Sequence, residues 1–159
     1  MMGSGKSTIG RLLAQKLNLR FFDIDFLIEN KTDMKIAEIF EKKGENAFRN
    51  LEKEITLKFL NKTNCIIALG GGAFINEIIK KKIKKKSISI WLSWNDETLI
   101  SRMRKNKKRP IALNLDDNGL KDLINSRSKI YSKANFKINC ENMNKVEIVK
   151  KITQMYEHI

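Results

Sequence analysis

The chain begins with Met1-Met2-Gly3-Ser4-Gly5-Lys6-Ser7-Thr8, which fits the second half of the phosphate-binding loop motif G-x-x-x-x-G-K-[ST]. Glycines allow the backbone N–H groups of such a loop to surround a phosphate, and the following helix adds the positive end of its dipole. Lys6 supplies a positive charge for the outer phosphates, and the Ser7 hydroxyl is a suitable ligand for Mg²⁺. The alternative is a Gly-Ser turn ahead of a helix that contains a lysine.

The first glycine of this motif, and the strand that normally carries it, have no counterpart before Gly3. That glycine would fall six residues before Lys6, ahead of Met1. A parallel sheet without its central strand would have unpaired backbone groups on both neighbouring strands, which is unfavourable. We therefore expect the sequence to be shortened at its N-terminus by about ten residues, the length of a short strand and its turn.

Helical and extended segments alternate along the rest of the chain, as judged from the spacing of apolar residues. The predicted helices cover residues 9–17, 35–60 with an interruption near Gly44, 76–83, 95–105, 117–132 and 144–158. The predicted strands cover residues 21–25, 65–69, 87–92 and 136–140. This order predicts the α/β class, with a parallel sheet between two layers of helices in a single domain over residues 1–159.

Three segments rich in glycine or acidic residues stand where predicted strands end. They are the phosphate-binding loop, Asp23 with Asp25, and Gly70–Gly72. Ligands of parallel sheets bind beyond the carboxyl ends of the strands, so one shared site is expected. On a strand Asp23 and Asp25 face the same side, where one can hold Mg²⁺ or its waters and the other can meet a substrate hydroxyl. The alternative is that the pair caps the next helix.

The chain is strongly basic, with a net charge of +14, which is a feature of many nucleic-acid-binding proteins. The basic run from Lys80 to Lys86 contains no aromatic residue, so we interpret it as a solvated helix end. Lys outnumbers Arg by 25 to 7, a bias that fits AT-rich coding. Each arginine is therefore expected where a planar, bidentate donor is required.

The cysteines and the absence of a long apolar run or an export signal are typical of a cytoplasmic protein. Cys65 and Cys140 stand far apart without metal-ligand spacing and are expected to be reduced. No apolar run approaches the length of a membrane span, and no export signal is recognised. Trp91 and Trp94 are expected to pack in the core or at its rim.

Several segments occur together in an order and at a spacing typical of one enzyme family. They are the loop through Thr8, Phe22-Asp23-Ile24-Asp25, Ile36-Ala37-Glu38-Ile39-Phe40, Gly44-Glu45, Phe48-Arg49 with Glu52, Leu69-Gly70-Gly71-Gly72-Ala73, Arg102, Arg109-Pro110, and Arg127 with Tyr131. In this combination the chain resembles the shikimate kinases over essentially its whole length. The resemblance implies a three-layer P-loop kinase fold with a sheet of about five strands, the first of which is absent from this sequence. It also implies a substrate-binding helical segment over about residues 25–53 and a lid over about residues 104–116.

The resemblance further implies ATP-dependent phosphorylation of the 3-hydroxyl of shikimate to shikimate 3-phosphate, a step of aromatic amino-acid biosynthesis. The residues that match the family's shikimate-binding positions are Asp25, Arg49, Gly71, Gly72 and Arg127. In this reading Asp25 hydrogen-bonds the reacting hydroxyl and can accept its proton, and the two arginines hold the substrate carboxylate. Glu52 follows Arg49 by one helical turn and is expected to orient it.

On the nucleotide side, the resemblance implies a site for ATP and Mg²⁺. The matching positions are Gly3, Ser4, Gly5, Lys6, Ser7, Thr8, Arg102 and Arg109. Lys6 and Arg109 are expected to stabilise the transferring phosphoryl group, with Arg109 carried on the lid, and Arg102 to stack on adenine. Ser7 is the expected direct ligand of Mg²⁺, and Asp23 is expected to hold the ion through water. The expected partners are ATP and shikimate for a cytoplasmic monomer, with no nucleic acid and no membrane.

Other interpretations remain open from the sequence. Another small P-loop metabolite kinase, such as one for gluconate, would share the nucleotide half of the site. A basic nucleic-acid-binding module and a P-loop protein without activity are alternatives from other classes. In the alternative interpretations of single residues, Arg49 and Arg127 each only pair with a neighbouring acid, Arg102 and Arg109 belong to a basic surface, and Gly70–Gly72 is only a flexible turn.

Overall fold

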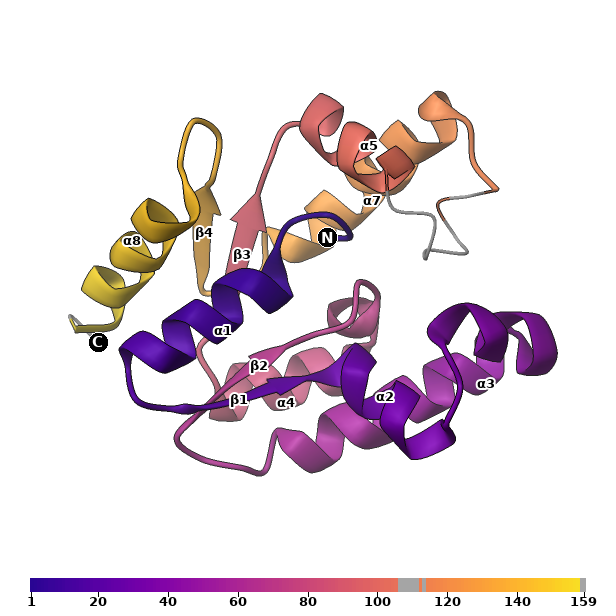
Figure 1. Ribbon diagram of the computed structural model, residues 1–159, viewed down its shortest axis with the longest axis horizontal. Coiled ribbons are helices and arrows are strands. Elements are labelled where there is room, and N and C mark those ends of the chain that lie inside the picture. Colours follow the sequence, from indigo (N-terminus) through magenta and orange to yellow (C-terminus); the bar gives the residue numbers. More distant parts are fainter. Residues whose placement is uncertain (106–111, 113, 158–159) are drawn as a thin grey trace.

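The computed structural model describes residues 1–105, 112 and 114–157 of the chain (Figure 1). The elements are α1 (Lys6–Lys16), β1 (Arg20–Asp23), α2 (Ile24–Thr32), α3 (Ile36–Phe59), β2 (Cys65–Ala68), the 3₁₀ turn η1 (Ala73–Ile75), α4 (Glu77–Lys86), β3 (Ile90–Ser93), α5 (Asp96–Lys105), α7 (Asp117–Tyr131), β4 (Phe136–Asn139) and α8 (Lys145–Glu157). The predicted alternation of helices and strands, and with it the α/β class, is confirmed. The predicted interruption of the long helix is also present, since Gly44 has a φ of 79° and a ψ of 168° within α3.

The strands form two parallel pairs rather than one continuous sheet. β1 pairs with β2 in the register Phe22 to Ile67, and β3 pairs with β4 in the register Leu92 to Ile138. Within the described residues no ladder joins β2 to β3. The parallel direction of each pair agrees with the sequence prediction, and the separation of the pairs differs from the single sheet that was predicted.

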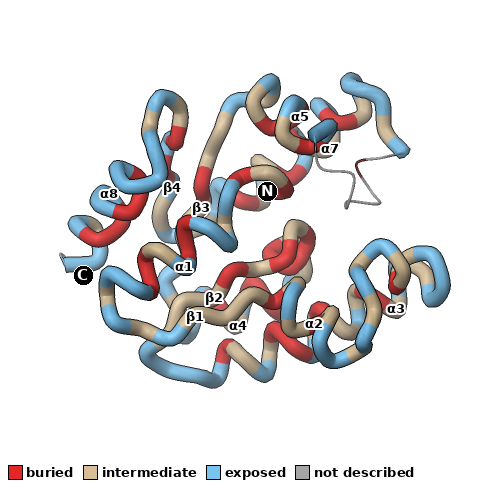
Figure 2. Tube along the Cα trace, in the orientation of Figure 1, coloured by how far each residue is buried: buried red, intermediate tan, exposed pale blue. Residues whose placement is uncertain are grey.

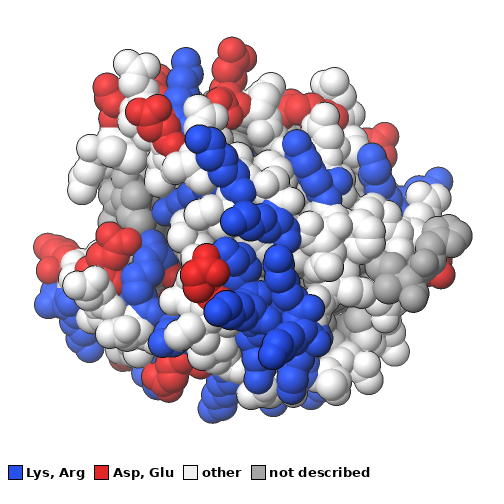
Figure 3. All heavy atoms as spheres, turned by 180° about the vertical axis from the view of Figure 1, so that it is seen from behind, with Lys and Arg blue, Asp and Glu red and all other residues white. Residues whose placement is uncertain are grey.

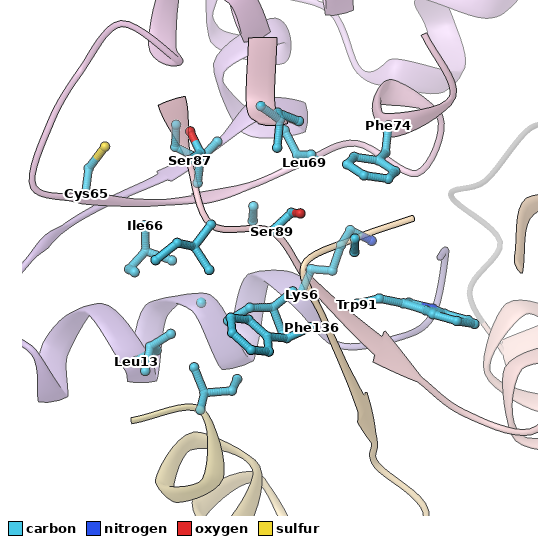
Figure 4. A pocket seen from close by; sticks show the side chains of 18 of the residues that line it. Lys6, Leu13, Cys65, Ile66, Leu69, Phe74, Ser87, Ser89, Trp91 and Phe136 are labelled. Carbon is cyan, nitrogen blue, oxygen red and sulfur yellow. The ribbon is translucent and has the colours of Figure 1, made fainter. Parts of the chain in front are cut away.

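A cavity of about 670 Å³ lies between the two pairs of strands (Figure 4). Its lining includes the β2 segment around Ile66, the β3 segment around Trp91, and Phe136 of β4. Met1 and Lys6 also contribute to its lining, so the start of the described chain lies beside it.

Apolar side chains on opposite faces of the strands pack into different clusters, which gives the molecule its layers. Buried and exposed positions alternate along the helices in Figure 2, as expected when one face of each helix packs inward. Ile66 of β2 packs on the cluster that contains Ile9 and Leu13 of α1, whereas its neighbour Ile67 packs on the clusters that contain Ile79 of α4 and Ile55 of α3. Successive strand residues face opposite sides, so helices cover both faces of the strands, as predicted.

A third apolar cluster joins α2 to α3. Ile24, Ile28 and Ile39 are completely buried, and Phe48 and Ile55 are nearly so. Complete burial of such a side chain contributes about 2 kcal/mol, so this cluster fixes α2 and the second half of α3 relative to each other. These are the two helices that carry Asp25 and Arg49.

Two local predictions are wrong. The strand ends at Asp23 instead of continuing to Asp25, because the Asp23 carboxylate caps the N-terminus of α2 and begins a helix there. The basic run is not entirely a solvated helix end, because Lys80 lies within α4, is only 6% exposed and pairs with Glu77 at 2.5 Å. Lys81, Lys84, Lys85 and Lys86 are exposed, as expected.

Basic side chains gather on one face of the molecule, where Figure 3 shows Lys and Arg spheres crowded together near the centre and the lower edge of the view. Among the described residues, no helix is both long enough and apolar enough to cross a membrane.

Candidate active site

The phosphate loop, residues Gly3–Thr8, leads directly into the first turn of α1. Gly5 has a φ of 83°, a left-handed conformation that glycine adopts without strain, and its carbonyl accepts the first helical hydrogen bond from Ile9. Lys6, Ser7 and Thr8 therefore occupy the N-terminal turn of α1, where backbone N–H groups and the helix dipole favour an anion. Ser7 and Thr8 are exposed.

Met1 contributes a carbonyl that helps to hold the phosphate loop. The hydroxyl of the buried Ser4 donates to this carbonyl at 2.8 Å, and the Lys6 ammonium donates to it at 2.6 Å. Both contacts join the loop to its own preceding backbone. The Lys6 ammonium is thus held at the loop.

Residues around α5 hold the same loop from its other side. The Trp94 indole donates from Nε1 to the Ser4 carbonyl at 3.1 Å, and Arg102 donates to the Gly3 carbonyl at 3.4 Å. The Arg102 guanidinium lies over the Trp94 ring, with 3.8 Å between its central carbon and the ring centroid. The structure therefore holds Arg102 against the phosphate loop with the help of Trp94, to which no role beyond packing was given. The stacking of Arg102 on adenine stays a prediction.

Asp23 and Asp25 have different positions at the end of β1. Asp23 Oδ1 accepts hydrogen bonds from the backbone N–H groups of Asp25 at 3.1 Å and Phe26 at 3.4 Å. The helix-capping alternative is therefore correct for Asp23. Asp25 stands in the first turn of α2, and its carboxylate is directed to the loop after β2, since a Cβ added to Gly70 would come within 2.7 Å of Asp25 Oδ1.

Arg49 on α3 is held by two acidic side chains. Its Nη1 donates to Glu52 at 2.7 Å, and its Nε and Nη2 donate to Glu45 at 3.1 and 3.0 Å. The predicted pairing with Glu52 is therefore present, and the contact with Glu45 is additional. The Glu52 side chain is 3% exposed and that of Arg49 is 28% exposed, so this pair is not an ordinary surface salt bridge.

Arg127 and Tyr131 on α7 both donate hydrogen bonds to the carbonyl of Gly71. The Arg127 contact is 3.3 Å long, and the Tyr131 hydroxyl forms a shorter one. Both residues are buried. Arg127 Nε and Glu52 Oε1 are buried without a hydrogen-bond partner within the described part of the chain. A buried charged group with unused hydrogen-bonding capacity is unfavourable unless a ligand or water completes it.

The three glycines after β2 have no space for side chains. A Cβ at Gly70 would overlap Glu52 Oε1, and a Cβ at Gly72 would overlap the Arg49 guanidinium. A Cβ at Gly71 would lie 2.9 Å from Met2 and 3.7 Å from Arg127. Each glycine is thus approached closely by a different side chain. At Gly71 that side chain is Met2, which directly precedes the phosphate loop. Gly70–Gly72 are therefore more than a flexible turn.

We call the group formed by Asp25, Arg49, Glu52, Arg127 and Tyr131 around Gly70–Gly72 the acceptor cluster. Burial raises the pKa of Glu52 above its ordinary value, and the nearby Asp25 charge adds to this effect, while Arg49 opposes it. Burial also lowers the pKa of Arg127, and the like charge of Arg49 lowers it further. Burial lowers the pKa of Arg49 as well, but pairing with Glu52 and Glu45 outweighs burial and leaves it raised. Water is thus partly excluded from these charges.

Most of the predicted site residues come together. Those on the substrate side, Asp25, Arg49, Gly71, Gly72 and Arg127, meet in the acceptor cluster, and Met2 connects this cluster to the phosphate loop. Arg109 and most of the predicted lid lie outside the described residues. Sequence reasoning gave no role to Glu45, Trp94 or Tyr131. Tyr131 was part of the recognised Arg127 segment, and Glu45 precedes Arg49 by one helical turn, so signals for these two were available.

Comparison with known proteins identifies the family. Residues 2–157 match the sequence profile of the family described as shikimate kinase. The chain belongs to the shikimate kinase family. It is 40% identical to the shikimate kinase of Persephonella marina over 151 residues, covering 95% of this chain and 92% of the relative. It is 39% identical to the shikimate kinase of Sulfurihydrogenibium sp., with coverage of 95% and 90%.

Solved structures of the shikimate kinase family have the same fold as this chain. Shikimate kinase from Acinetobacter baumannii in complex with shikimate superposes with a TM-score of 0.93 at 32% identity, covering 99% of this chain and 89% of the other. Shikimate kinase from Aquifex aeolicus gives a TM-score of 0.87 at 37% identity, with coverage of 99% and 92%.

Proposed function

We propose that the protein transfers the γ-phosphoryl group of ATP to the 3-hydroxyl of shikimate and releases shikimate 3-phosphate and ADP. One observation carries this proposal: a carboxylate, two guanidinium groups and a side-chain-free loop converge at Gly70–Gly72, next to a phosphate loop. A small ring with one carboxylate and several hydroxyls requires such a set. Membership of the family and the shikimate complex of a structural relative support the same substrate.

On the acceptor side, Arg49 and Arg127 bind the substrate carboxylate. Guanidinium groups form two parallel hydrogen bonds with a carboxylate, which fixes the orientation of the ring as well as its position. The buried Arg127 Nε has an unused donor in the described part of the chain, and an anionic ligand or its bound water would satisfy it. Asp25 accepts the proton of the attacking hydroxyl, and Glu52 positions Arg49.

On the nucleotide side, the N–H groups of the phosphate loop and the Lys6 ammonium bind the β- and γ-phosphates. The Lys6 ammonium, which donates to the Met1 carbonyl in the structure, would also donate to a negatively charged phosphate oxygen, and such a charge-assisted hydrogen bond is the stronger of the two. Arg102 presents a planar cation for adenine, and Arg109 on the lid stabilises the transferring phosphoryl group. Closure of the lid would also exclude water, which otherwise competes as the acceptor.

The oxygen donors at the end of β1 and the start of α1 fit Mg²⁺. Ser7 offers an exposed hydroxyl, and Asp23 uses Oδ1 for both of its capping hydrogen bonds, so Oδ2 can accept from a water bound to the metal. Mg²⁺ in kinases keeps several waters and takes most other ligands from phosphates, so two protein groups are enough. When bound, the ion neutralises charge that develops on the phosphates.

A coupled ADP-release assay tests this function. The protein is incubated with MgATP and either shikimate or gluconate, and the product is identified by ³¹P NMR. We expect ADP release that requires shikimate and a single phosphate ester at its 3-position. Turnover on gluconate alone would support the rival metabolite kinase instead. Turnover on neither compound by protein that binds ADP would contradict the proposal.

A further inference from the structure

We propose that Trp94 is a positioning residue for nucleotide binding, acting through the Ser4 carbonyl and the Arg102 guanidinium. This inference rests on the proposed function, since it concerns the ATP half of the same site. Trp94 lies between β3 and α5, ninety positions along the chain from the loop that it contacts. It is partly buried and packs against both large apolar clusters, so its ring is fixed by the core.

The first effect of Trp94 is on the direction of the loop amides. In a planar trans peptide unit the carbonyl and the following N–H point in opposite directions. Trp94 holds the Ser4 carbonyl at 3.1 Å, and this fixes the Gly5 N–H on the opposite side of the loop. Arg102 does the same for the Gly3 carbonyl at 3.4 Å, and hence for the Ser4 N–H. Two amides of the phosphate loop are thereby turned away from α5 before any ligand arrives.

The second effect of Trp94 is on the orientation of Arg102. The guanidinium carbon lies 3.8 Å from the indole centroid, well inside the range of about 6 Å for a cation–π contact. A long arginine side chain loses considerable rotamer freedom when it is ordered, and a rigid aromatic surface provides that order in advance. With one planar face on Trp94, Arg102 retains its opposite face for a stacked base.

The close approach of α5 to the loop makes this arrangement sensitive to side-chain size. A Cβ at Gly3 would lie 3.3 Å from the Arg102 Cβ, so the loop backbone lies directly against the arginine stem.

The Trp94 indole contributes both a hydrogen-bond donor and a flat surface, and these two contributions can be separated by substitution. Phenylalanine retains the surface without the donor, and leucine retains neither.

Steady-state kinetics of Trp94→Phe and Trp94→Leu test the proposal. We expect the KM for ATP to rise about threefold in Trp94→Phe and about tenfold in Trp94→Leu, from the ordinary strengths of one hydrogen bond and one cation–π contact. The KM for shikimate should change less than twofold in both. The matched control is Trp91→Phe, which alters the other tryptophan without touching the phosphate loop and should leave the KM for ATP unchanged.

A double-mutant cycle shows whether Trp94 acts through Arg102. In an Arg102→Ala background, Trp94→Leu should raise the KM for ATP only about threefold, because the loss of the Ser4 contact alone remains. In the Trp91→Phe protein, Trp94 is the single tryptophan, and its emission should change when ADP is added. If leucine destabilises the fold, the Phe variant and the emission measurement still decide the question.

Several outcomes would overturn the inference. One is an unchanged KM for ATP in a folded Trp94→Leu protein, and another is an equal rise of the KM for shikimate, which would indicate general loosening. Full additivity in the cycle would separate Trp94 from Arg102. The proposed function is tested independently by shikimate-dependent ADP release from the unsubstituted chain.

Discussion

The acceptor cluster around Gly70–Gly72 contains side chains of opposite charge that pair with one another, whereas the side-chain contacts described at the phosphate loop go to its backbone carbonyls. In the acceptor cluster, Arg49 pairs with Glu52 at 2.7 Å and Arg127 is buried. At the phosphate loop, the carbonyls of Met1, Gly3 and Ser4 accept hydrogen bonds from side chains. One end of the site is thus built from buried charges and the other from oriented backbone.

This contrast follows from what each end binds. A loop of N–H groups suits phosphate oxygens in any nucleotide, so its chemistry can be generic. A particular ring acid requires side chains at particular places. Burial opposes the charged form of Glu52 and of Arg127, so these charges are kept despite an unfavourable contribution to folding. Ligand binding is a sufficient reason to keep them.

Asp25→Asn is expected to give the largest effect and to separate the two ends most clearly. The amide cannot accept the proton of the attacking hydroxyl, so kcat should fall about a thousandfold. ADP affinity, measured by calorimetry, should be unchanged, because Asp25 is proposed to contact the attacking hydroxyl of the acceptor and not the nucleotide. A parallel loss of ADP binding would show that the ends are not independent.

Arg49→Lys should weaken the acceptor end alone. An ammonium cannot reproduce the planar fork that now pairs with Glu45 and Glu52, so the KM for shikimate should rise about thirtyfold, equivalent to about 2 kcal/mol. The KM for ATP serves as the internal control and should change less than twofold. Normal shikimate affinity in this variant would contradict the bidentate role of Arg49.

Glu52→Gln tests whether the buried Glu52 carboxylate contributes more to shikimate binding than to the free energy of unfolding. The KM for shikimate should rise about tenfold, because a neutral amide orients Arg49 less firmly. The free energy of unfolding at pH 7 should change by less than about 1 kcal/mol, because Arg49 keeps its pair with Glu45 and the cost of burying the Glu52 charge is removed. Urea unfolding monitored by circular dichroism measures this. A loss of several kcal/mol would assign Glu52 a mainly structural role.

The same variant gives a prediction on pH. The folded-state pKa of Glu52 lies above the ordinary value of 4.5, so between these values the folded chain binds a proton more tightly than the unfolded chain. The contribution of Glu52 to the free energy of unfolding is therefore fully present below pH 4.5 and is lost as the pH rises through the raised pKa. The stability of the unsubstituted chain relative to Glu52→Gln should fall over that interval. A rise would contradict the assigned direction of the pKa.

The sequence was informative where the signal was local. The break at Gly44 and the glycines after β2 could be read from neighbouring residues, whereas the helix α2 was not among the predicted helices. The meeting of the segments that follow β1 and β2 was expected from the rules of parallel sheets. The extension of the first strand to Asp25 failed because capping by Asp23 competes with strand formation within the same few residues. The prediction that Lys80 is solvated was wrong because a run of lysines does not indicate which of them packs its aliphatic stem inward.

Contacts between distant segments could not be predicted in the same way. Trp94 reaches Ser4 across ninety positions of sequence, and Tyr131 reaches Gly71 across sixty. Nothing in the local sequence of an aromatic residue distinguishes one that fills the core from one that also donates a hydrogen bond. Such residues are recognised only when the fold supplies the acceptor.

Tyr131→Phe should give the smallest effect and refine the boundary of the acceptor cluster. The ring remains packed against Phe74 and Trp91, so only the hydrogen bond to the Gly71 carbonyl is lost. Arg127 still donates to the same carbonyl, and the KM for shikimate should therefore rise only about threefold, as expected for one hydrogen bond of about 0.7 kcal/mol. Kinetics with Arg127→Lys and the double variant supply the control. If the two changes are not additive, both side chains fix one backbone carbonyl, and the specificity of the acceptor end includes the orientation of Gly71 as well as the charges around it.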